Sequence, residues 1–353
     1  MPNIRTDIRL AELRRSGQTF AQIASTENLP ISTVRHAIRR GNVALGIAQP
    51  APTRRTTASR ASLIVSNFAG YEISDRFTFG VEIECVGLNT SEAARALRNA
   101  GIDCSDNGYT HAVLPTWKVV YDGSLRSRNG SCEVVSPVLR GRDGLKEIAN
   151  VEKILKNAGA TINRSCGQHI HIGVDGIVSS NVQAEIISQH ARWQSAFDTL
   201  VPLSRFGNTY CQPRRVEVAE RRATTWAQGV TAESGRYYTL NLSSFAKYGT
   251  FEFRQFAGCL NGQRIASWIA LHIAFIQRIE HEILSNDLVL CAVSNEDIEA
   301  NIDNTQPRNR RGVAVFNALM EILAPTMDAD AVTYLRARSG NVGANESNRA
   351  TAI

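Results

Sequence analysis

Residues 77–86 have the sequence FTFGVEIECV, in which large apolar residues alternate with polar ones. A period of two is typical of a β-strand that is buried on one face. The apolar members would point into a core, and Glu82 and Glu84 would lie side by side on the opposite face. Two like charges so close repel each other, so the pair indicates either a solvated strand face or a cation site.

The composition is that of a globular protein, with 353 residues of which 43% are hydrophobic and 20% charged. This length suits one large domain with an appendage, or two ordinary domains. The sequence contains no apolar run of about 18 residues that could span a membrane, and no secretory signal at its start. Its seven cysteines include no Cys-x-x-Cys pair, which favours reduced thiols in a cytoplasm over a disulfide framework or a zinc ribbon.

Positive charge is concentrated at the N-terminus. Residues 1–60 contain ten arginines, no lysine and three acidic residues, a net charge of +7, whereas the rest of the chain carries −1. Only this head has the charge signature of a polyanion partner. We therefore expect DNA to bind through residues 1–60.

Residues 1–41 fit three short helices. The first would cover residues 6–15, the second 20–26, and the third would begin with Ser32 as its N-cap and end at Gly41. A helix, a short turn and a capped helix resemble a helix-turn-helix of the resolvase or sigma-factor kind. A three-helix bundle used for protein contact is the alternative. On the resemblance, the residues that would contact bases or phosphates are Ser32, Thr33, Arg35, His36, Arg39 and Arg40.

Composition sets the remaining boundaries. Residues 42–68 are rich in Ala, Thr, Arg and Pro without an apolar period and are predicted to be a basic flexible linker. Residues 69–338 would form the main domain, and 339–353 a disordered polar tail. Within the main domain we expect further strands at 117–121, 132–137, 166–174, 236–242 and 249–256, and helices at 90–100, 144–157, 181–200, 261–283, near Asp297, at 313–323 and at 328–338. The segment before residue 236 is basic and predicted to be irregular, and it contains Arg205, Arg214, Arg215, Arg221 and Arg222.

Four of the predicted strands offer polar side chains on one face. Because carboxylates dominate, the set favours a hard cation such as Mg²⁺ or Mn²⁺ over zinc. Two histidines at i and i+2 on a strand share a face and form a candidate ligand pair. The side chains are Glu82 and Glu84, then Glu133, then His169 and His171, then Glu252 and Arg254.

At this point the sequence resembles the amidoligase family, carboxylate–amine ligases related to glutamine synthetase and glutamate–cysteine ligase. The matching motifs occur in the family's order over roughly residues 77–285. They are the strand 79–84, Asp122-Gly123-Ser124 with 133–137, the Gly-Gln-His-Ile-His strand 167–171, Arg236-Tyr237-Tyr238 with Asn241, and Glu252-Phe253-Arg254.

The resemblance implies an α+β fold, with a curved, mainly antiparallel sheet of the glutamine synthetase-like type and helices behind it. ATP and Mg²⁺ would bind on the concave face. The implied reaction is ADP-forming: ATP phosphorylates a substrate carboxylate, and an amine attacks the acyl phosphate to form an amide or isopeptide bond. A P-loop is absent from the sequence, which excludes P-loop kinases.

The resemblance also implies a role for each motif residue. Arg254 would stabilise the transferring phosphoryl group, and Asp122 would hold or deprotonate the amine. His171, Arg236 and Asn241 would bind nucleotide or substrate. The metal ligands would be Glu82, Glu84, Glu133, His169 and Glu252, with the nucleotide phosphate as the alternative partner of His169.

Two other functions stay open from the sequence. The ligase-like domain of a DNA-binding regulator could sense a nucleotide or metabolite, and Cys166 with the two histidines could form the zinc site of a hydrolase. The pairing of a helix-turn-helix with a ligase suggests a phage or mobile-element setting. The family permits peptides, cell-wall fragments, protein side chains and small amines as substrates, so neither the carboxylate nor the amine is identified.

Overall fold

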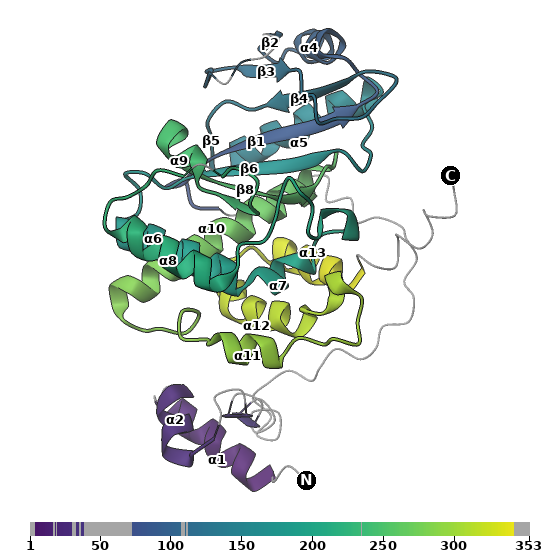
Figure 1. Cartoon of the computed structure of the whole chain (residues 1–353). Coiled ribbons are helices and arrows are strands. Elements are labelled where there is room, and N and C mark those ends of the chain that lie inside the picture. Colours follow the sequence, from purple (N-terminus) through teal and green to yellow (C-terminus); the bar gives the residue numbers. More distant parts are fainter. Residues whose placement is uncertain are drawn as a thin grey trace. The chain divides into compact units, whose positions relative to one another are not determined.

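The computed structural model describes residues 4–16, 18, 20–29, 33–34, 37–38, 73–106, 110, 112–233 and 235–341 (Figure 1). The chain divides into two compact units, Met1–Ile64 and Val65–Ile353. The predicted linker 42–68 and the tail from residue 342 onward lie outside the described residues. Among the helices described, none is long and apolar enough to cross a membrane.

The N-terminal unit begins with the first two predicted helices, α1 (Ile4–Arg15) and α2 (Phe20–Glu27). Residues 33–34 and 37–38 are also helical, and Thr33 is exposed. The other five candidate DNA-contacting residues, Ser32, Arg35, His36, Arg39 and Arg40, lie outside the described residues. The unit has its own apolar core of Leu10, Ala11, Ile23, Ala24, Val34, Ala37 and Ile38.

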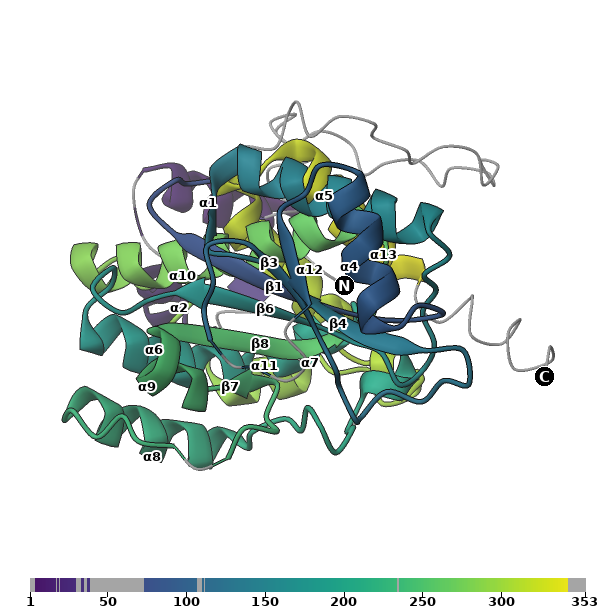
Figure 2. The same ribbon diagram turned by 90° about the horizontal axis from the view of Figure 1, so that it is seen from above.

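The larger unit is built on one open, mostly antiparallel sheet of eight strands. Its path runs β2-β3-β4-β1-β6-β8-β7, with β5 paired to β1, and only β2 and β3 are parallel. Figure 2 shows β1, β6 and β8 side by side, as their pairing requires. The strands are β1 (Thr78–Val86), β2 (Cys104–Asp106), β3 (Trp117–Val120), β4 (Ser131–Val135), β5 (Leu139–Arg140), β6 (Gly167–Gly173), β7 (Leu240–Asn241) and β8 (Thr250–Ala257).

Strand β1 lies inside the sheet between β4 and β6, and its alternation is as the sequence predicts. Phe79, Val81, Ile83 and Cys85 are all buried in the main core. Helix α5 comes so close to this face that a Cβ at Gly144 would lie 2.9 Å from the Phe79 ring. The polar face of β1 is therefore the face turned away from α5.

Helices α4, α5 and α10 pack against the apolar face of the sheet. Helix α4 lies where the sequence predicts a helix and begins with a capping box: Asn89 accepts from the Glu92 amide, and Glu92 accepts from the Asn89 amide in return. The helices of this unit are α4 (Thr90–Asn99), α5 (Gly141–Asn157), α6 (Ser180–Arg192), α7 (Gln194–Asp198), α8 (Val216–Ala227), α9 (Ser243–Tyr248), α10 (Gly262–Ser285), α11 (Asn295–Ala300), α12 (Val313–Leu323) and α13 (Ala329–Asn341), with short 3₁₀ turns at Leu203–Arg205, Arg308–Arg310 and Ala324–Thr326.

Several local predictions need correction. The single helix expected over 181–200 is two helices, α6 and α7, which meet at Trp193. The strand expected over 236–242 is reduced to β7, and residues 339–341 continue α13 rather than a tail. The segment expected to be irregular contains α8, whose buried residues Ala219, Ala223 and Trp226 follow a helical period that faces α6.

Candidate active site

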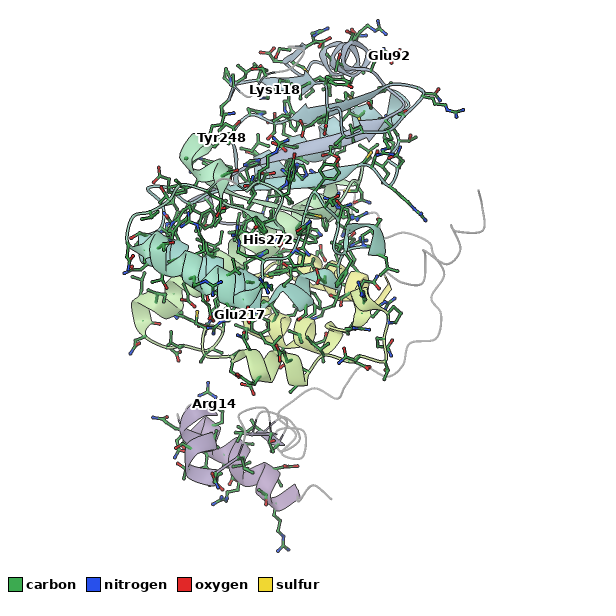
Figure 3. All side chains as sticks on the ribbon, viewed as in Figure 1. Arg14, Glu92, Lys118, Glu217, Tyr248 and His272 are labelled. Carbon is green, nitrogen blue, oxygen red and sulfur yellow. The ribbon has the colours of Figure 1, made fainter. Side chains whose placement is uncertain are left out.

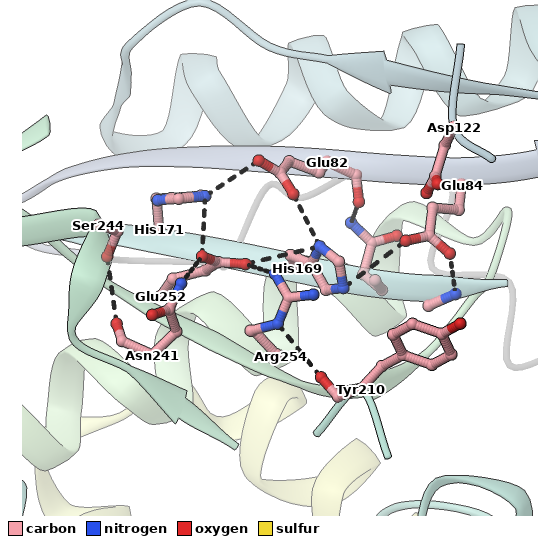
Figure 4. A network of polar contacts seen from close by, with 12 residues as sticks. Glu82, Glu84, Asp122, His169, His171, Tyr210, Asn241, Ser244, Glu252 and Arg254 are labelled. Atoms are coloured by element: carbon pink, nitrogen blue, oxygen red, sulfur yellow. Dashed lines mark hydrogen bonds and ion pairs between the residues drawn. The ribbon is translucent and has the colours of Figure 1, made fainter. Parts of the chain in front are cut away.

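The polar side chains of five neighbouring strands meet on the face of the sheet opposite the one that α4, α5 and α10 cover (Figure 4). The pairing register sets this arrangement, because residues opposite each other in adjacent strands share a face. The opposed pairs are Glu84 with Glu133 between β1 and β4, Glu82 with His169 between β1 and β6, His171 with Glu252 between β6 and β8, and Asn241 with Glu252 between β7 and β8.

Glu82 holds the two histidines together. One carboxylate oxygen lies 2.7 Å from Nδ1 of His169, and the other lies 3.2 Å from Nε2 of His171. The other nitrogen of the second ring, His171 Nδ1, lies 2.9 Å from the hydroxyl of Thr250. Both rings are thus oriented by oxygens of neighbouring strands, as ligating imidazoles are in metal sites.

Glu252 connects the histidines to the arginine. Its oxygens lie 3.6 Å from His169 Nδ1 and 4.0 Å from His171 Nε2. Arg254 forms a close ion pair with the same carboxylate, and the side-chain amide of Asn241 donates to it at 2.6 Å. Arg254 also donates from Nε to the backbone carbonyl of Tyr210 at 3.4 Å.

A β-bulge interrupts β8 beside Arg254. Between the pairs Ile170 with Phe253 and Gln168 with Phe256, two residues of β8 oppose one residue of β6. The extra residue interrupts the alternation, so Phe253 and Phe256 can both be buried although they are three positions apart. Arg254 keeps the face of Glu252.

The remaining acidic residues form the other end of the cluster. Glu84 accepts from the backbone amide of Gly167 at 2.5 Å, and one of its oxygens lies 3.6 Å from His169 Nε2. Asp122 accepts from the amide and hydroxyl of Ser124, in the turn that the sequence predicts there. Ligand atoms converge within 4.8 Å of one another in three groups: Glu82, Glu133 and His169; Glu82, His171 and Glu252; and Glu84, Asp122 and Glu133.

The cluster shifts the pKa values of two of its carboxylates in opposite directions. Burial opposes ionisation of Glu82, but the hydrogen bonds from His169 and His171 outweigh it and lower the pKa of Glu82 well below its usual range. Burial and then the charges of Glu82 and Glu84 raise the pKa of Glu133 well above its usual range. This repulsion is what a bound cation would relieve.

The arginine keeps its charge in this setting. Burial alone would lower the pKa of Arg254, but the carboxylates of Glu252 and Glu82 outweigh burial and raise it. The pKa of His171 is raised in the same way: burial opposes protonation, and the carboxylates of Glu252 and Glu82 overcome it.

Nine of the ten residues predicted for the ligase site lie in or beside this cluster. They are Glu82, Glu84, Asp122, Glu133, His169, His171, Asn241, Glu252 and Arg254. Arg236 differs from them, because its side chain is exposed, its guanidinium packs over the Tyr237 ring at 5.1 Å, and it donates to the hydroxyl of that tyrosine.

Sequence reasoning missed three polar residues near the cluster. Thr250 contacts His171, and Arg205 packs over Gly167. Lys118 is buried in β3 and donates to the backbone carbonyls of Thr110 and Ala112, and burial lowers its pKa (Figure 3). The alternation of residues 117–120 could have placed Lys118 on a face, but no local pattern pointed to Arg205.

Cys166, the cysteine of the zinc alternative, is not part of the ligand groups formed by described residues. Its thiol is buried and donates to the side-chain oxygen of Asn163 at 3.7 Å. Burial raises the pKa of this thiol to about 11, which opposes the thiolate that zinc requires. The geometry therefore gives no support to a zinc site built on Cys166.

Comparison with known proteins gives one family. A family model described as "Putative amidoligase enzyme" matches residues 75–276, more than half of the chain and the part that carries the whole acidic cluster. A search of curated proteins finds no match. Among solved structures, the bifunctional glutathione synthetase from Pasteurella multocida aligns with a TM-score of 0.38 at 10% identity. The alignment covers 76% of this chain and 47% of that protein, so the chain spans less than half of its length.

Proposed function

The chain belongs to the amidoligase family, and we propose that it is a carboxylate–amine ligase that is ATP-dependent, Mg²⁺-dependent and ADP-forming. A substrate carboxylate would attack the terminal phosphate of ATP to give an acyl phosphate and ADP. An amine would then attack the acyl carbon, so that the C–N bond forms, the C–O bond to phosphate breaks, and inorganic phosphate leaves. The fold would be that of the glutamine synthetase-like ligases.

One observation carries this proposal: four carboxylates, two histidines and an arginine converge on one face of the sheet, from strands far apart in sequence. Phosphoryl transfer from ATP needs this combination, because metal ions must neutralise the triphosphate and a cation must stabilise the group in transit.

The donor set fits Mg²⁺ or Mn²⁺. All three groups of convergent ligands are rich in carboxylate oxygens, and each contains at most one imidazole. The raised pKa of Glu133 is a second sign, since its carboxylate is repelled by the neighbouring acids when no cation lies between them. Glu82, Glu84, Glu133, His169 and Glu252 would hold the ions, which would neutralise the charge of the triphosphate.

Other residues of the cluster would act on the substrates. Arg254 is held at the site by Glu252 and by the Tyr210 carbonyl, so that its remaining donors can stabilise charge on the transferring phosphoryl group. Asp122 lies beside Glu84 and Glu133 and would take the proton from the attacking amine. His171 and Asn241 would orient nucleotide or carboxylate, and Arg236 would reach the substrate from the exposed side.

The test is the release of ADP and phosphate from Mg-ATP by the purified chain, with pools of carboxylates, amino acids, amines and short peptides. Release should require a donor pair and should vanish in Glu82→Ala and Glu252→Ala. Glu217→Ala is the matched control, because Glu217 is an exposed acid on α8 (Figure 3). No release, with Mg-ATP binding that both site variants weaken, would instead indicate a nucleotide-sensing regulator; no ATP binding at all would refute the site.

A second proposal concerns residues 1–60, which we infer bind DNA. The charge of +7 and the separate small helical unit support it, and Thr33 is exposed on a helical segment. Binding should weaken steeply as salt rises, because cationic side chains release counterions from the phosphates. A gel-shift titration of the full chain against duplex DNA, with Arg35→Ala and Arg39→Ala variants, tests this. Equal retention of duplex DNA and of an uncharged polymer would refute it.

A further inference from the structure

Arg205 is a buried arginine that lies beside the acidic cluster. The proposed reaction gives this residue no role. It ends the 3₁₀ turn Leu203–Arg205 and is only 5% exposed. Its guanidinium donates to two backbone carbonyls of β8, at 2.7 Å to Arg254 and 3.4 Å to Gln255. Among the described residues no carboxylate forms an ion pair with it, although buried cations are normally paired.

The guanidinium lies directly over Gly167 of β6. A Cβ at this position would be 3.0 Å from Nη2 and 3.3 Å from Nη1 of Arg205, and 3.2 Å from Nε2 of His169. Three nitrogens of two side chains therefore surround one point of the strand, and the absence of a side chain at Gly167 is what lets them meet. The amide of the same glycine donates to Glu84 at 2.5 Å, so this point adjoins the ligand groups of the cluster.

The positive charge of Arg205 is available to bind an anion. One guanidinium nitrogen of Arg254 forms a close ion pair with Glu252. The guanidinium of Arg205, by contrast, donates to neutral backbone carbonyls. A planar guanidinium binds two oxygens of a phosphoryl or carboxylate group at once. Its backbone anchors on β8 also fix its position, so the ligand would not have to order a flexible side chain.

We propose that Arg205 and His169 form an oxyanion subsite over Gly167 that binds a phosphate group. The role of this subsite rests on the proposed function. In that reaction it would hold the phosphoryl group during and after its transfer to the substrate carboxylate. A carboxylate has the same planar pair of oxygens. The position beside the Glu84, Asp122 and Glu133 ligand group favours the phosphate, because metal-bound phosphates and a cationic clamp act together in phosphoryl transfer.

The test is a titration of the full chain with inorganic phosphate at constant Mg²⁺, followed by ³¹P line broadening. Arg205→Met keeps most of the side-chain length without the charge and should weaken phosphate binding by roughly tenfold or more. Arg222→Met is the control, because Arg222 is a partly buried arginine of α8 that pairs with Glu233 at 3.1 Å. It should bind phosphate like the unmodified chain. A parallel titration with acetate separates the two oxyanions.

A second variant covers the case in which Arg205→Met fails to fold. Gly167→Ala keeps both side chains but places a methyl group within 3.3 Å of each, so it should weaken phosphate binding with the arginine still present. Equal phosphate affinity in folded Arg205→Met and in the unmodified chain would overturn the subsite, as would a loss confined to acetate. The unmodified chain could bind phosphate yet release no ADP under any condition, while Arg205→Met loses the phosphate binding. That result would refute the ligase and leave the subsite standing.

Discussion

Glu82 and Glu133 lie on adjacent strands of one cluster and have opposite pKa shifts. Glu82 is hydrogen-bonded to two imidazoles, whereas Glu133 lies beside the acids Glu82 and Glu84. The lowered pKa of Glu82 favours a carboxylate that can bind a cation, whereas the raised pKa of Glu133 means that a bound cation would promote its ionisation. Metal binding should release protons from the protein for this reason.

Glu133→Gln should therefore raise the stability of the metal-free protein and weaken its metal binding. The raised pKa means that the stability which neutral Glu133 contributes is present at low pH and is lost as pH rises above about 4.5 towards the folded-state pKa. The amide does not ionise, so at pH 8 with EDTA the variant should gain about 1 kcal/mol in the free energy of unfolding. Thermal unfolding with EDTA and with Mg²⁺ measures both effects. A lower melting temperature in EDTA would contradict the prediction.

Asp198 supplies a pH dependence that is independent of the cluster. It is on α7 behind the sheet, where the side-chain amides of Gln194 and Gln255 donate to it at 2.7 and 3.3 Å. Burial raises its pKa to about 7, against the donated hydrogen bonds. An acid with a raised pKa stabilises the fold below its unfolded-state pKa, and this contribution is lost as pH rises to about 7.

Asp198→Asn should flatten that slope. The free energy of unfolding of the unmodified chain should fall between about pH 4 and pH 7, by a few kcal/mol at most. Above pH 7 the contribution of Asp198 should no longer change with pH. The asparagine oxygen can still accept from both glutamines, so the variant should have nearly the same stability at low pH and greater stability at pH 8. Urea unfolding at pH 5, 6, 7 and 8 compares the two proteins. Parallel pH profiles would show that Asp198 ionises normally.

The approach of α5 to β1 depends on a small residue. Gly144 lies on α5 where a Cβ would be 2.9 Å from both the Phe79 ring and Leu139 Cβ, and these two residues are buried beneath the helix. Phe79 and Glu82 belong to one strand, so the packing of α5 on Phe79 also fixes the position of the strand that carries the site. The close contact at Gly144 therefore links the packing of the core to the geometry of the cluster.

Gly144→Ala should destabilise the protein by about 1–3 kcal/mol, because the helix or the ring must shift to admit the methyl group. Gly340→Ala is the matched control: this helical glycine, on α13, has nothing within 4 Å of its added Cβ. It should stabilise the protein by about 0.5–1 kcal/mol, since alanine loses less backbone entropy. Chemical unfolding of the three proteins gives the comparison. Equal destabilisation by both substitutions would rule out the steric explanation.

The two units have separate cores. The main core runs from Phe77 to Leu335, and the N-terminal core contains only residues 10–38. Ligand atoms of the cluster all come from the larger unit. The larger unit therefore contains every residue that we assign to the proposed reaction. The N-terminal unit would bring the enzyme to DNA and would supply no reacting group.

A chain shortened to residues 65–353 should keep donor-dependent ADP release and the melting temperature of the main transition. It should lose retention on duplex DNA, because the net charge of +7 lies within residues 1–60. Turnover assays and gel shifts on the full and shortened chains measure the two activities separately. Loss of turnover on shortening would show that the N-terminal unit takes part in the reaction.

The sequence by itself determined the alternation of β1, the cap at Asn89, the His-x-His strand and the family. These are local features, since period and capping depend only on residues a few positions apart. Tertiary structure decided the rest: the register that sets Glu84 opposite Glu133, the bulge between Phe253 and Phe256 in β8, and the approach of Arg205 to Gly167. It also decided the break between α6 and α7. Such features depend on packing between distant segments, and no local period records which strands become neighbours or where an extra residue enters a pair.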